Sequence, residues 1–495
     1  MAKTFHIITL GCKVNQYESE ALREAWLDAG HCELASADGA DLVLINSCAI
    51  TAKAVADLRA LARRVRAASP GCELLVTGCA AQALPGELAE LPIDALVPQS
   101  DKLSLLRWLG DGKAPEAETA AGEESSSLPS SAALQHEAGI DPAVHFTLLN
   151  LAHTGPDKHS DASSGDMPDF WANAAPEEES TGPQSSFPAF SISAYARSRA
   201  VLKIHDGCSQ HCTYCIVPQG RGPSVSRPWP ESVAEAGRLI QAGFREIVLS
   251  GVNLRQYGSD LAPPEDFWDF ATRLEAAFAD EWAGRLRLRI SSLEPGQLNA
   301  KGLAVLAKSR LIAPQLHLSI QSGSQRILKR MGRGHYDPAS IAGFLAKLAK
   351  IWPMFGLGAD FICGFPGESG EDFTETLSLV DNLPFTYAHV FPYSKRPGTA
   401  AAKLPGQIPA QVKKERAARL RALMDAKKEA FLQRQLALSQ VLLAPEDGRG
   451  QGVNEFYSEC RFTDGYKPTG KELIAARPAG IEKRVLLVNK ITTNR

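Results

Sequence analysis

Three short apolar segments near the start of the chain share one design, in which a strand-like run ends in a small residue followed by a cysteine. The segments cover residues 5–12, 42–48 and 74–79. Amphipathic helical patterns lie between them, near residues 18–29 and 51–68. Strands that alternate with helices form a parallel sheet, and the carboxyl ends of its neighbouring strands face one crevice. The pattern therefore predicts an α/β domain in which Cys12, Cys48 and Cys79 meet at one edge of the sheet.

A second region, from residue 200 to about 393, alternates strand-like runs with helical stretches six times. The runs cover residues 200–205, 246–250, 285–291, 315–321, 358–363 and 388–393. Six parallel strands are too few for a closed eight-stranded barrel, but they suit an open, partial (β/α)6 barrel whose site lies at the carboxyl ends of the strands. We therefore expect a partial barrel with a functional site at that end.

The C-terminal part of the chain changes pattern twice. Residues 409–438 read as one long basic helix, and residues 439–495 contain short apolar runs separated by Gly and Pro turns. Short strands at such spacing predict a small β-barrel. The basic helix has two open interpretations, contact with RNA or a solvated charged surface.

Residues 111–190 differ in composition from the rest of the chain, with many Ala, Ser, Gly and Pro and no sustained helical or strand period. They contain fourteen acidic and two basic residues, so the whole-chain charge of −3 leaves +9 on the remaining residues. We expect a mostly disordered insert, with an extra surface subdomain as the alternative. One hypothesis is that the insert acts as a polyanion that competes with weakly bound RNA.

Length and composition exclude several classes of protein. The 495 residues, 44% hydrophobic and 22% charged, fit a multi-domain enzyme better than a fibrous or peptide-scale protein. The sequence has no apolar run as long as a membrane span and opens with strand-like sequence instead of a secretory signal, which predicts a cytoplasmic protein. Ten cysteines in a reducing compartment favour metal binding or catalysis over disulfides.

The most specific motif is Cys-x3-Cys-x2-Cys, formed by Cys208, Cys212 and Cys215 after the first predicted barrel strand. Three thiolates this close together can hold a compact soft-metal centre, and three is one fewer than the four irons of a cubane cluster require. One iron would then remain open to another ligand. A zinc knuckle and incidental cysteines are the alternative interpretations.

This motif resembles the signature of the radical S-adenosylmethionine (SAM) superfamily, in which the open iron chelates the amino and carboxylate groups of SAM. Segments after later strands are similar to SAM-binding positions of that superfamily. The resemblance implies that SAM is bound by Ser250, Gly251 and Asn253 after the second strand, Ser319 and Gln321 after the fourth, and Asp360 and Gly364 after the fifth. The glycines would permit close approach of the adenine.

Two incomplete cluster sites in one chain resemble a narrower family, the radical SAM methylthiotransferases. The resemblance implies an auxiliary [4Fe-4S] cluster on Cys12, Cys48 and Cys79, a SAM-binding [4Fe-4S] cluster in the barrel and a TRAM-like β-barrel at the C-terminus. Residues 10–15, LGCKVN, are similar to the MtaB-type branch, which modifies threonylcarbamoyladenosine in tRNA. The isopentenyladenosine branch tends to read FGCQMN here, and the branch that acts on a ribosomal protein tends to read LGCPKN.

The implied domain order is an N-terminal methylthiotransferase domain, an acidic insert, a radical SAM barrel, a basic helix and a TRAM-like barrel. The expected boundaries are 1–110, 111–190, 191–408, 409–438 and 439–495.

The resemblance implies transfer of a methylthio group to C2 of N6-threonylcarbamoyladenosine at position 37, next to the tRNA anticodon. Two [4Fe-4S] clusters and SAM would be the cofactors, and a 5′-deoxyadenosyl radical would remove the C2 hydrogen. The partners would be the single-stranded anticodon loop of tRNA, a flavodoxin- or ferredoxin-like reductant and an unidentified sulfur donor. The alternatives are the same chemistry on isopentenyladenosine or on a ribosomal protein, and an iron-sulfur electron-transfer or sensor protein.

Three arginines, Arg285, Arg287 and Arg289, alternate along one predicted strand and so share a face. Contacts to SAM or RNA inside the barrel and simple ion pairs are both open interpretations. Four further cysteines have no partner by spacing and are expected to be structural: Cys32, Cys72, Cys363 and Cys460.

Overall fold

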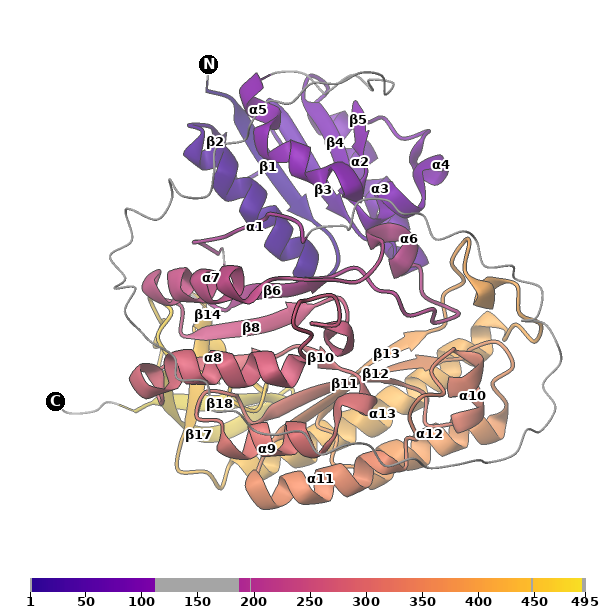
Figure 1. Ribbon diagram of the computed structural model, residues 1–495, viewed down its shortest axis with the longest axis vertical. Helices are drawn as coiled ribbons and strands as arrows, with labels where there is room; N and C mark the ends of the chain where they lie inside the picture. Colours follow the sequence, from indigo (N-terminus) through magenta and orange to yellow (C-terminus); the bar gives the residue numbers. More distant parts are fainter. Residues whose placement is uncertain (1, 112–186, 196, 447, 492–495) are drawn as a thin grey trace. The chain divides into compact units, whose positions relative to one another are not determined.

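The structure is a computed structural model (Figure 1), and it describes residues 2–111, 187–195, 197–446 and 448–491. The acidic insert lies outside the described residues except for a few at its ends. The predictions that it is disordered and that it competes with RNA therefore concern residues outside the described ranges. The described residues belong to one compact unit.

The N-terminal sheet has five parallel strands in the order β2-β1-β3-β4-β5 (Figure 1). The strands are β1 (Thr4–Thr9), β2 (Cys32–Glu33), β3 (Leu42–Ser47), β4 (Glu73–Gly78) and β5 (Ala95–Val97). The helices, with η for the 3-10 type, are α1 (Lys13–Asp28), α2 (Ala52–Ala68), α3 (Cys79–Ala83), α4 (Pro85–Leu88), η1 (Gln99–Arg107) and α5 (Trp108–Asp111). The predicted parallel α/β domain is confirmed. Sequence periodicity does not reveal β2 and β5, because they are only two and three residues long.

Helices cover both faces of this sheet. Phe5 and Leu44 pack with Trp26 of α1 in one apolar cluster. Val43, the neighbour of Leu44 in β3, packs with Leu58 of α2 in a second cluster. Because successive residues of a strand point to opposite faces, a strand covered on both sides buries the residues of both faces. This explains why every residue of β3 is buried.

The second α/β region consists of two four-stranded sheets, β7-β6-β8-β9 and β10-β11-β12-β13. The strands are β6 (Ala200–Asp206), β7 (Val225–Ser226), β8 (Glu246–Gly251), β9 (Arg287–Ile290), β10 (Ser292–Leu293), β11 (Gln315–Gln321), β12 (Gly356–Cys363) and β13 (Tyr387–Pro392). All neighbouring strands are parallel except β6 and β7. A parallel bridge between Leu288 and Ile312 links the two sheets. The six predicted strands are therefore present, in the order of an open, partial barrel.

Helices connect these strands. They are α6 (Val217–Arg221), α7 (Trp229–Gln241), η2 (Leu254–Gln256), α8 (Phe267–Trp282), η3 (Pro295–Gln297), α9 (Ala300–Lys308), α10 (Gln325–Arg330), α11 (Ser340–Ile351), α12 (Gly370–Asn382) and η4 (Ala400–Ala402). Both α8 and α12 begin with a capping box, in which the side chains of Asp266 and Ser369 satisfy backbone N–H groups of the first turn. The helix starts are thus determined locally by sequence.

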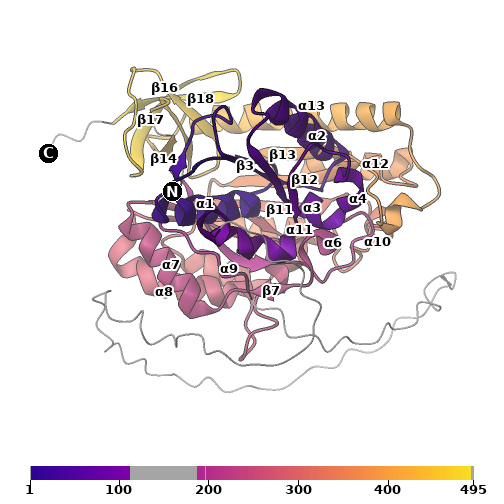
Figure 2. The same ribbon diagram turned by 90° about the horizontal axis from the view of Figure 1, so that it is seen from above.

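The C-terminal region begins with α13 (Ala410–Gln435), which packs along β13 (Figure 2). A closed barrel follows, with the strand order β14-β15-β16-β18-β17. Its strands are β14 (Val441–Glu446), β15 (Gln451–Asn454), β16 (Glu459–Phe462), β17 (Ile474–Glu482) and β18 (Val485–Lys490). The predicted long helix and small β-barrel are confirmed. Among the described helices, none combines the length and the apolar character that a membrane crossing requires.

Part of the positive charge of α13 is used within the fold. Arg416 forms an ion pair with the buried Glu368 at 2.5 Å, and Lys427 donates to the carbonyl oxygen of Asp381 at 2.7 Å. These two cations attach the helix to the partial barrel. The basic composition of α13 is therefore not by itself a measure of a free RNA-binding face.

Two of the three alternating arginines attach the C-terminal barrel to the partial barrel. Arg287 and Arg289 both bind the buried Glu246, at 2.5 and 2.7 Å. They also donate to backbone carbonyls of the small barrel, those of Leu442, Val453, Asn454 and Glu455. Arg285 precedes β9 and stacks on Trp282 at 4.7 Å, so the predicted alternation holds for two residues only. Of the two interpretations, ion pairing is the one that the structure confirms.

Candidate active site

The three N-terminal cysteines follow strands that end at the same level of the sheet. The registers of β1, β3 and β4 place the last residues of these strands side by side. Cys48 and Cys79 directly follow β3 and β4, and both are buried. Cys12 follows β1 after a short turn and is half-buried. The parallel topology thus brings three cysteines that are distant in sequence to one sheet edge, as predicted.

Close packing requires the glycines that precede two of these cysteines. Gly11 has a φ of +101°, and a Cβ at this position would lie 2.7 Å from the Cβ of Cys48. Gly78 has a φ of +95°, and its Cβ would lie 2.4 Å from the carbonyl oxygen of Ser47. Residues with a Cβ disfavour such a φ, and a Cβ cannot approach other atoms as closely as these distances require. The small residues before the cysteines therefore have a steric cause.

Asn15, in the first turn of α1, joins two strand ends. Its Nδ2 donates to the carbonyl oxygens of Leu10 at 2.9 Å and Ser47 at 2.8 Å. Its Oδ1 accepts from Nη2 of Arg221 at 2.5 Å. Asn15 thereby connects the N-terminal cysteine turns to α6, the helix that follows the second set of cysteines.

A buried ionic network borders both cysteine sets. Glu18 forms ion pairs with Lys102 at 2.6 Å and with Lys203 at 2.9 Å. Arg221 bridges Glu18 and Asp206, at 2.9 Å from each. Three cations thus face two carboxylates. Because an uncompensated charge is unfavourable in a buried position, the network favours a further anion nearby.

Arg221 also lies beside the N-terminal cysteines. Burial opposes its charge, but Cys79 and Glu18 raise the pKa of Arg221 well above its usual value. Its neighbour Gly220 packs against Cys79, since a Cβ at Gly220 would lie 3.2 Å from the Cβ of that cysteine. The excess positive charge is therefore adjacent to the N-terminal thiols, where it favours their anionic, metal-binding form.

The second set of cysteines lies on the loop at the carboxyl end of β6. The backbone N–H of Cys208 donates to the carbonyl oxygen of Gly222 at 3.0 Å, which closes the loop. Two polar side chains reach the sulfurs. Asn253 Nδ2 lies 3.6 Å from Cys208 Sγ, and Arg333 Nη1 lies 3.7 Å from Cys212 Sγ. This set, too, has a cation and a hydrogen-bond donor beside it.

Burial raises the pKa of thiols in both sets. The pKa reaches about 12 for Cys48 and about 12 for Cys215, although a backbone N–H two residues further on donates to each sulfur and lowers it. Burial also raises the pKa of Cys79 and of Cys212. Such thiols stay protonated at neutral pH unless a metal replaces the proton. The sets therefore have the chemistry of metal ligands rather than of free nucleophiles.

The donor sets fit [4Fe-4S] clusters. Each set offers three thiols, and a cubane held by three thiolates keeps one iron open. Within the described ranges, the one group of three ligand atoms that lie within 4.8 Å of one another belongs to His317, Asp360 and His389, so neither cysteine set is compact enough to surround a single ion. A cubane distributes its thiolates over separate irons and suits the wider spacing. The geometry therefore disfavours the zinc-knuckle alternative.

The structure places Ser250 and Gly251 inside β8, at its end, which corrects the expectation that they follow the strand, and it places Asn253 two residues beyond β8. A Cβ at Gly251 would lie 2.7 Å from the Cβ of His205, so this glycine lets β8 and β6 approach each other. Asn253 donates to Gln210 Oε1 at 3.1 Å as well as to the cysteine loop. These three residues therefore lie beside the second cysteine set.

Ser319 and Gln321 lie within β11, which corrects the expectation that they follow the strand. The Oγ of Ser319 donates to the carbonyl oxygen of Leu293 at 3.2 Å, and its own carbonyl accepts from Arg333 at 2.7 Å. Gln321 ends the strand with a φ of +70°, which is uncommon for a residue other than glycine. Such conformations concentrate at ligand sites, where the surrounding structure fixes them.

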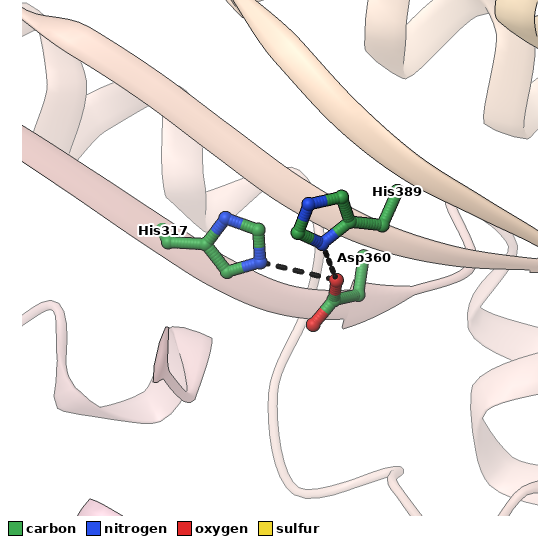
Figure 3. Close-up of side chains that lie close together, drawn as sticks. All are labelled: His317, Asp360 and His389. Atoms are coloured by element: carbon green, nitrogen blue, oxygen red, sulfur yellow. Dashed lines mark hydrogen bonds and ion pairs between the residues drawn. The ribbon is translucent and has the colours of Figure 1, made fainter. Parts of the chain in front are cut away.

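Asp360 lies inside β12 rather than after it, and it joins two histidines from the neighbouring strands (Figure 3). Its Oδ1 lies 3.1 Å from Nε2 of His317 and 3.0 Å from Nδ1 of His389. Burial alone would raise the pKa of Asp360, but the two histidines hold it well below its usual value. Sequence reasoning expected a SAM contact here and missed both histidines.

Gly364 makes room for a helix side chain. It has a φ of +73°, and a Cβ at this position would lie 2.2 Å from Cγ of Lys413 in α13. Its N–H donates to Oε2 of Glu368 at 2.7 Å. The structure therefore gives this glycine a steric reason within the fold, because α13 fills the space beside its Cα, and its contact with adenine stays a prediction.

Sequence reasoning also missed the two arginines beside the cysteines. A signal for them exists, since Arg221 and Arg333 each stand between two glycines, in Gly-Arg-Gly segments. Gly222, which follows Arg221, and Gly332, which precedes Arg333, have φ values of +73° and +72°. Such turns let a long cationic side chain fold back into the protein.

The cysteines expected to be structural are all free thiols: Cys32, Cys72, Cys363 and Cys460.

Two family models match the chain. Residues 4–97 match the family described as "Uncharacterized protein family UPF0004", and residues 202–380 match the Radical SAM superfamily. The first match covers the sheet that carries the N-terminal cysteines, and the second covers most of the partial barrel.

Among relatives, the threonylcarbamoyladenosine tRNA methylthiotransferase MtaB of Bacillus subtilis (strain 168) is 34% identical over 422 residues, which are 85% of this chain and 80% of that protein. The tRNA-2-methylthio-N(6)-dimethylallyladenosine synthase of Nocardia farcinica (strain IFM 10152) is 34% identical over 91% of this chain and 79% of that protein. In fold alone, the chain is similar to the radical SAM methyltransferase TsrM of Kitasatospora setae. The TM-score is 0.51 at 14% identity, and the match covers 81% of this chain and 74% of that one.

Proposed function

The chain belongs to the family of radical SAM methylthiotransferases, and from this premise we propose that it adds a methylthio group to C2 of N6-threonylcarbamoyladenosine at position 37 of tRNA. The observation that carries the chemistry is the pair of three-cysteine sets bordered by one buried ionic network. The substrate is supported by relatives named for it in Bacillus subtilis, Thermotoga maritima and Rickettsia prowazekii, which are 30–34% identical over 84–85% of the chain. The LGCKVN segment agrees with this branch.

The cysteines are the proposed cluster ligands. Cys12, Cys48 and Cys79 would hold the auxiliary [4Fe-4S] cluster, and Cys208, Cys212 and Cys215 would hold the cluster that binds SAM. When bound, the clusters and SAM supply the reductive SAM cleavage, the radical and the sulfur chemistry for which proteins have no side chain.

The chain's own residues fix the cysteine loop and the strand ends around it. Arg333 joins the second cysteine set to β11, because its Nη1 lies beside Cys212 and its Nη2 donates to the carbonyl of Ser319. Glu294 holds this arginine at 3.0 Å. Hydrogen bonds and charges next to the sulfurs tune the affinity and reduction potential of a cluster. The proposed SAM contacts lie in or just after β8, β11 and β12: Ser250, Gly251, Asn253, Ser319, Gln321, Asp360 and Gly364.

Exclusion of water from the site depends on contacts between the two α/β regions. Ile216, which directly follows Cys215, is buried in the apolar cluster of the N-terminal domain together with Cys79. Glu18 of α1 pairs with Lys203 of β6 in fully buried positions. Water that reaches a radical causes side reactions, so a dry boundary is a requirement of the proposed reaction.

The proposed partner is the anticodon loop of tRNA, where an unpaired base can be turned out and inserted into a pocket. We propose that the enzyme acts in the cytoplasm, with a flavodoxin- or ferredoxin-like reductant and a separate sulfur donor. The charge of +9 outside the insert agrees with a polyanionic substrate, and binding should weaken as salt rises.

Mass spectrometry of tRNA nucleosides tests the proposal. The gene would be expressed in a host that lacks its own enzyme of this kind, beside a Cys208→Ala control. We expect 2-methylthio-N6-threonylcarbamoyladenosine only with the unchanged gene. Absence of this nucleoside, despite about eight irons per chain, would contradict the substrate.

A second candidate substrate has its own support, since a relative named for dimethylallyladenosine is as similar in identity as the MtaB of Bacillus subtilis. The same nucleoside digest distinguishes the two. A methylthio product on the dimethylallyl, that is isopentenyl, nucleoside alone would establish the second candidate in place of the first.

A further inference from the structure

A cavity of about 670 Å³ lies between β13, α13 and the C-terminal barrel. This volume is within the usual range for small organic ligands, roughly 300–1,000 Å³. Tyr387 and His389 of β13 line it, together with Arg421 of α13, Tyr457 of the small barrel and Arg199. Apart from His389, which contacts Asp360, these side chains have no role in the cluster and SAM sites described above.

The acidic side chains of the cavity already have partners. Asp425 pairs with Arg484 at 2.6 Å, and Glu459 lies 3.6 Å from Lys428. The carboxylate of Glu446 accepts a hydrogen bond from a side chain of β15 at 2.8 Å. Among the described residues that line the cavity, no carboxylate is therefore without a partner and available to a cationic ligand.

Two arginines of the cavity differ in this respect. Arg421 donates to the carbonyl oxygen of Val390 at 2.8 Å, and Arg199 lies over the ring of Tyr457 at 5.8 Å. In the part of the chain that the structure describes, no carboxylate forms an ion pair with either guanidinium. The charge of Arg199 helps to lower the pKa of the buried Glu246, whose ion pairs are with Arg287 and Arg289. A guanidinium binds a carboxylate through parallel hydrogen bonds. The cavity is thus suited to an anionic ligand.

A row of aromatic side chains leads from the cavity towards the carboxyl end of β13. Tyr387, His389 and Phe391 alternate along the strand and share a face, with ring centroids 6.1 and 6.2 Å apart. Tyr457 extends the row, 5.2 Å from Tyr387. His389 and Phe391 are 57% and 43% exposed. Exposed rings of this kind stack unpaired bases.

The ring of His389 is held in one orientation (Figure 3). Its Nδ1 lies 3.0 Å from Asp360, which His317 approaches from the other side at 3.1 Å. His317 is itself placed by Tyr387, whose Oη accepts from Gln315 at 2.9 Å. Because this chain of contacts reaches the buried strand β11, His389 presents a preorganised face at the edge of the partial barrel.

We infer that this cavity binds the threonylcarbamoyl group of the substrate nucleoside, with Arg199 and Arg421 binding its carboxylate and with His389 and Phe391 stacking against the adenine. The inference rests on the proposed substrate. N6 is bonded to C6, and C6 and C2 belong to the same six-membered ring of adenine, so a base on this row extends its N6 substituent into the cavity while C2 faces the carboxyl ends of the strands. A dimethylallyl group carries no charge, and the two arginines therefore select against it.

Binding of synthetic anticodon stem-loops to the full-length protein with reconstituted clusters tests this inference. The loops carry threonylcarbamoyladenosine, isopentenyladenosine or plain adenosine at position 37, and fluorescence anisotropy at fixed salt gives the Kd. We expect the unchanged protein to prefer the first loop. Arg421→Gln and Arg199→Gln should each weaken the binding of that loop about 10- to 100-fold. Each should change the Kd of the plain adenosine loop by less than about twofold. Arg421→Lys should have an intermediate effect.

The matched control is Arg419→Gln, on the same helix, because Arg419 stacks on Phe373 and does not line the cavity. It should leave the preference unchanged. Unaltered iron content and circular dichroism would show that each variant is folded. The inference is wrong if the unchanged protein shows no preference for the threonylcarbamoyladenosine loop, or if both glutamine variants retain that preference. It is also wrong if the variants bind all three loops more weakly by the same factor, as expected for the loss of a phosphate contact.

Failure of the substrate proposal gives a different result. In that case the unchanged protein forms no methylthio product from threonylcarbamoyladenosine in tRNA. Failure of the cavity inference leaves that product intact and equal in the unchanged protein and in Arg421→Gln.

Discussion

The two cysteine sets reach similar chemistry by different routes. Cys208, Cys212 and Cys215 lie on one loop, and their spacing is visible in a single line of sequence. The N-terminal cysteines lie on three separate turns and meet only because the strand order β1-β3-β4 aligns three strand ends. The first set is therefore encoded locally, whereas the second depends on the folding of a whole domain.

The surroundings of the two sets differ as well. The loop set is contacted by single side chains, those of Asn253 and Arg333. The N-terminal set lies beside Arg221, which is part of a network of five buried charged residues. A site assembled from distant segments needs such long-range contacts, because no single segment of the chain holds all three cysteines.

Removal of one cysteine from each set should produce the largest difference. Cys79→Ala and Cys208→Ala should each reduce the iron content from about eight to about four per chain. Cys208→Ala should abolish SAM cleavage and product formation. Cys79→Ala should abolish methylthiolation and leave SAM cleavage largely intact, as measured by mass spectrometry of 5′-deoxyadenosine and of tRNA nucleosides. Cys32→Ala, at an exposed free thiol, is the control and should change nothing. Full product formation by Cys79→Ala would remove the assignment of the N-terminal set.

Glu18→Gln should disrupt the buried ion pairs beside the N-terminal cysteine set. It leaves Lys102, Lys203 and Arg221 with one carboxylate in buried positions, and we expect a loss of about 3–5 kcal/mol in the free energy of unfolding. Urea denaturation measures the change. Asp57→Asn, which breaks an exposed pair with Lys53, should lose less than about 1 kcal/mol. Equal losses in the two variants would show that the network is not a stabilising unit.

The same network predicts a pH dependence. Burial alone would raise the pKa of Glu18, but Arg221, Lys102 and Lys203 hold it well below its usual value. A carboxyl with a lowered folded-state pKa stabilises the fold above its unfolded-state pKa, about 4.3 for glutamate. Stability should therefore fall as the pH drops below about 4.3, and it should fall less steeply in Glu18→Gln. Parallel curves for the two proteins would contradict the prediction.

Gly11→Ala should affect only the N-terminal set. Gly11 and Gly30 both have positive φ, but a Cβ at Gly11 would meet Cys48, whereas one at Gly30 meets nothing within 4 Å. We expect Gly11→Ala to be about 1–3 kcal/mol less stable than Gly30→Ala in thermal denaturation, and to lose about four irons. If the two variants have equal stability and iron content, the tight packing at the strand ends has no role in holding the site.

The smallest expected effect concerns reduction potentials. Arg333→Gln removes a positive charge 3.7 Å from Cys212 and should lower the potential of the SAM-side cluster by tens of millivolts, on the order of what one partly screened charge contributes. Arg221→Gln should do the same for the N-terminal cluster, because Arg221 lies beside Cys79. Redox titrations followed by electron paramagnetic resonance measure the reduction potential of each cluster separately. A common shift of both clusters in either variant would mean that the sets are not electrostatically distinct.

Sequence patterns predicted the elements with strong periodicity and missed the contacts between distant segments. The six barrel strands and the long helix were predictable because each is a sustained apolar or charged pattern. The resemblance to SAM-binding segments placed Asp360 after a strand, whereas the structure holds it inside β12 between two histidines. The roles of Arg287 and Arg289 stayed open because their partner, Glu246, lies on another strand.

The sequence by itself determined the chemistry that this protein can support. Three cysteines on one loop, three more after strand-like runs and the alternation of strands with helices follow from composition and short-range order, which local physics governs. Only the tertiary structure decided which charges surround each set, which glycines are sterically required and where the cavity lies whose two arginines form no ion pair with a described carboxylate. These features depend on distances between segments that are far apart in the chain, and a linear pattern does not contain such distances.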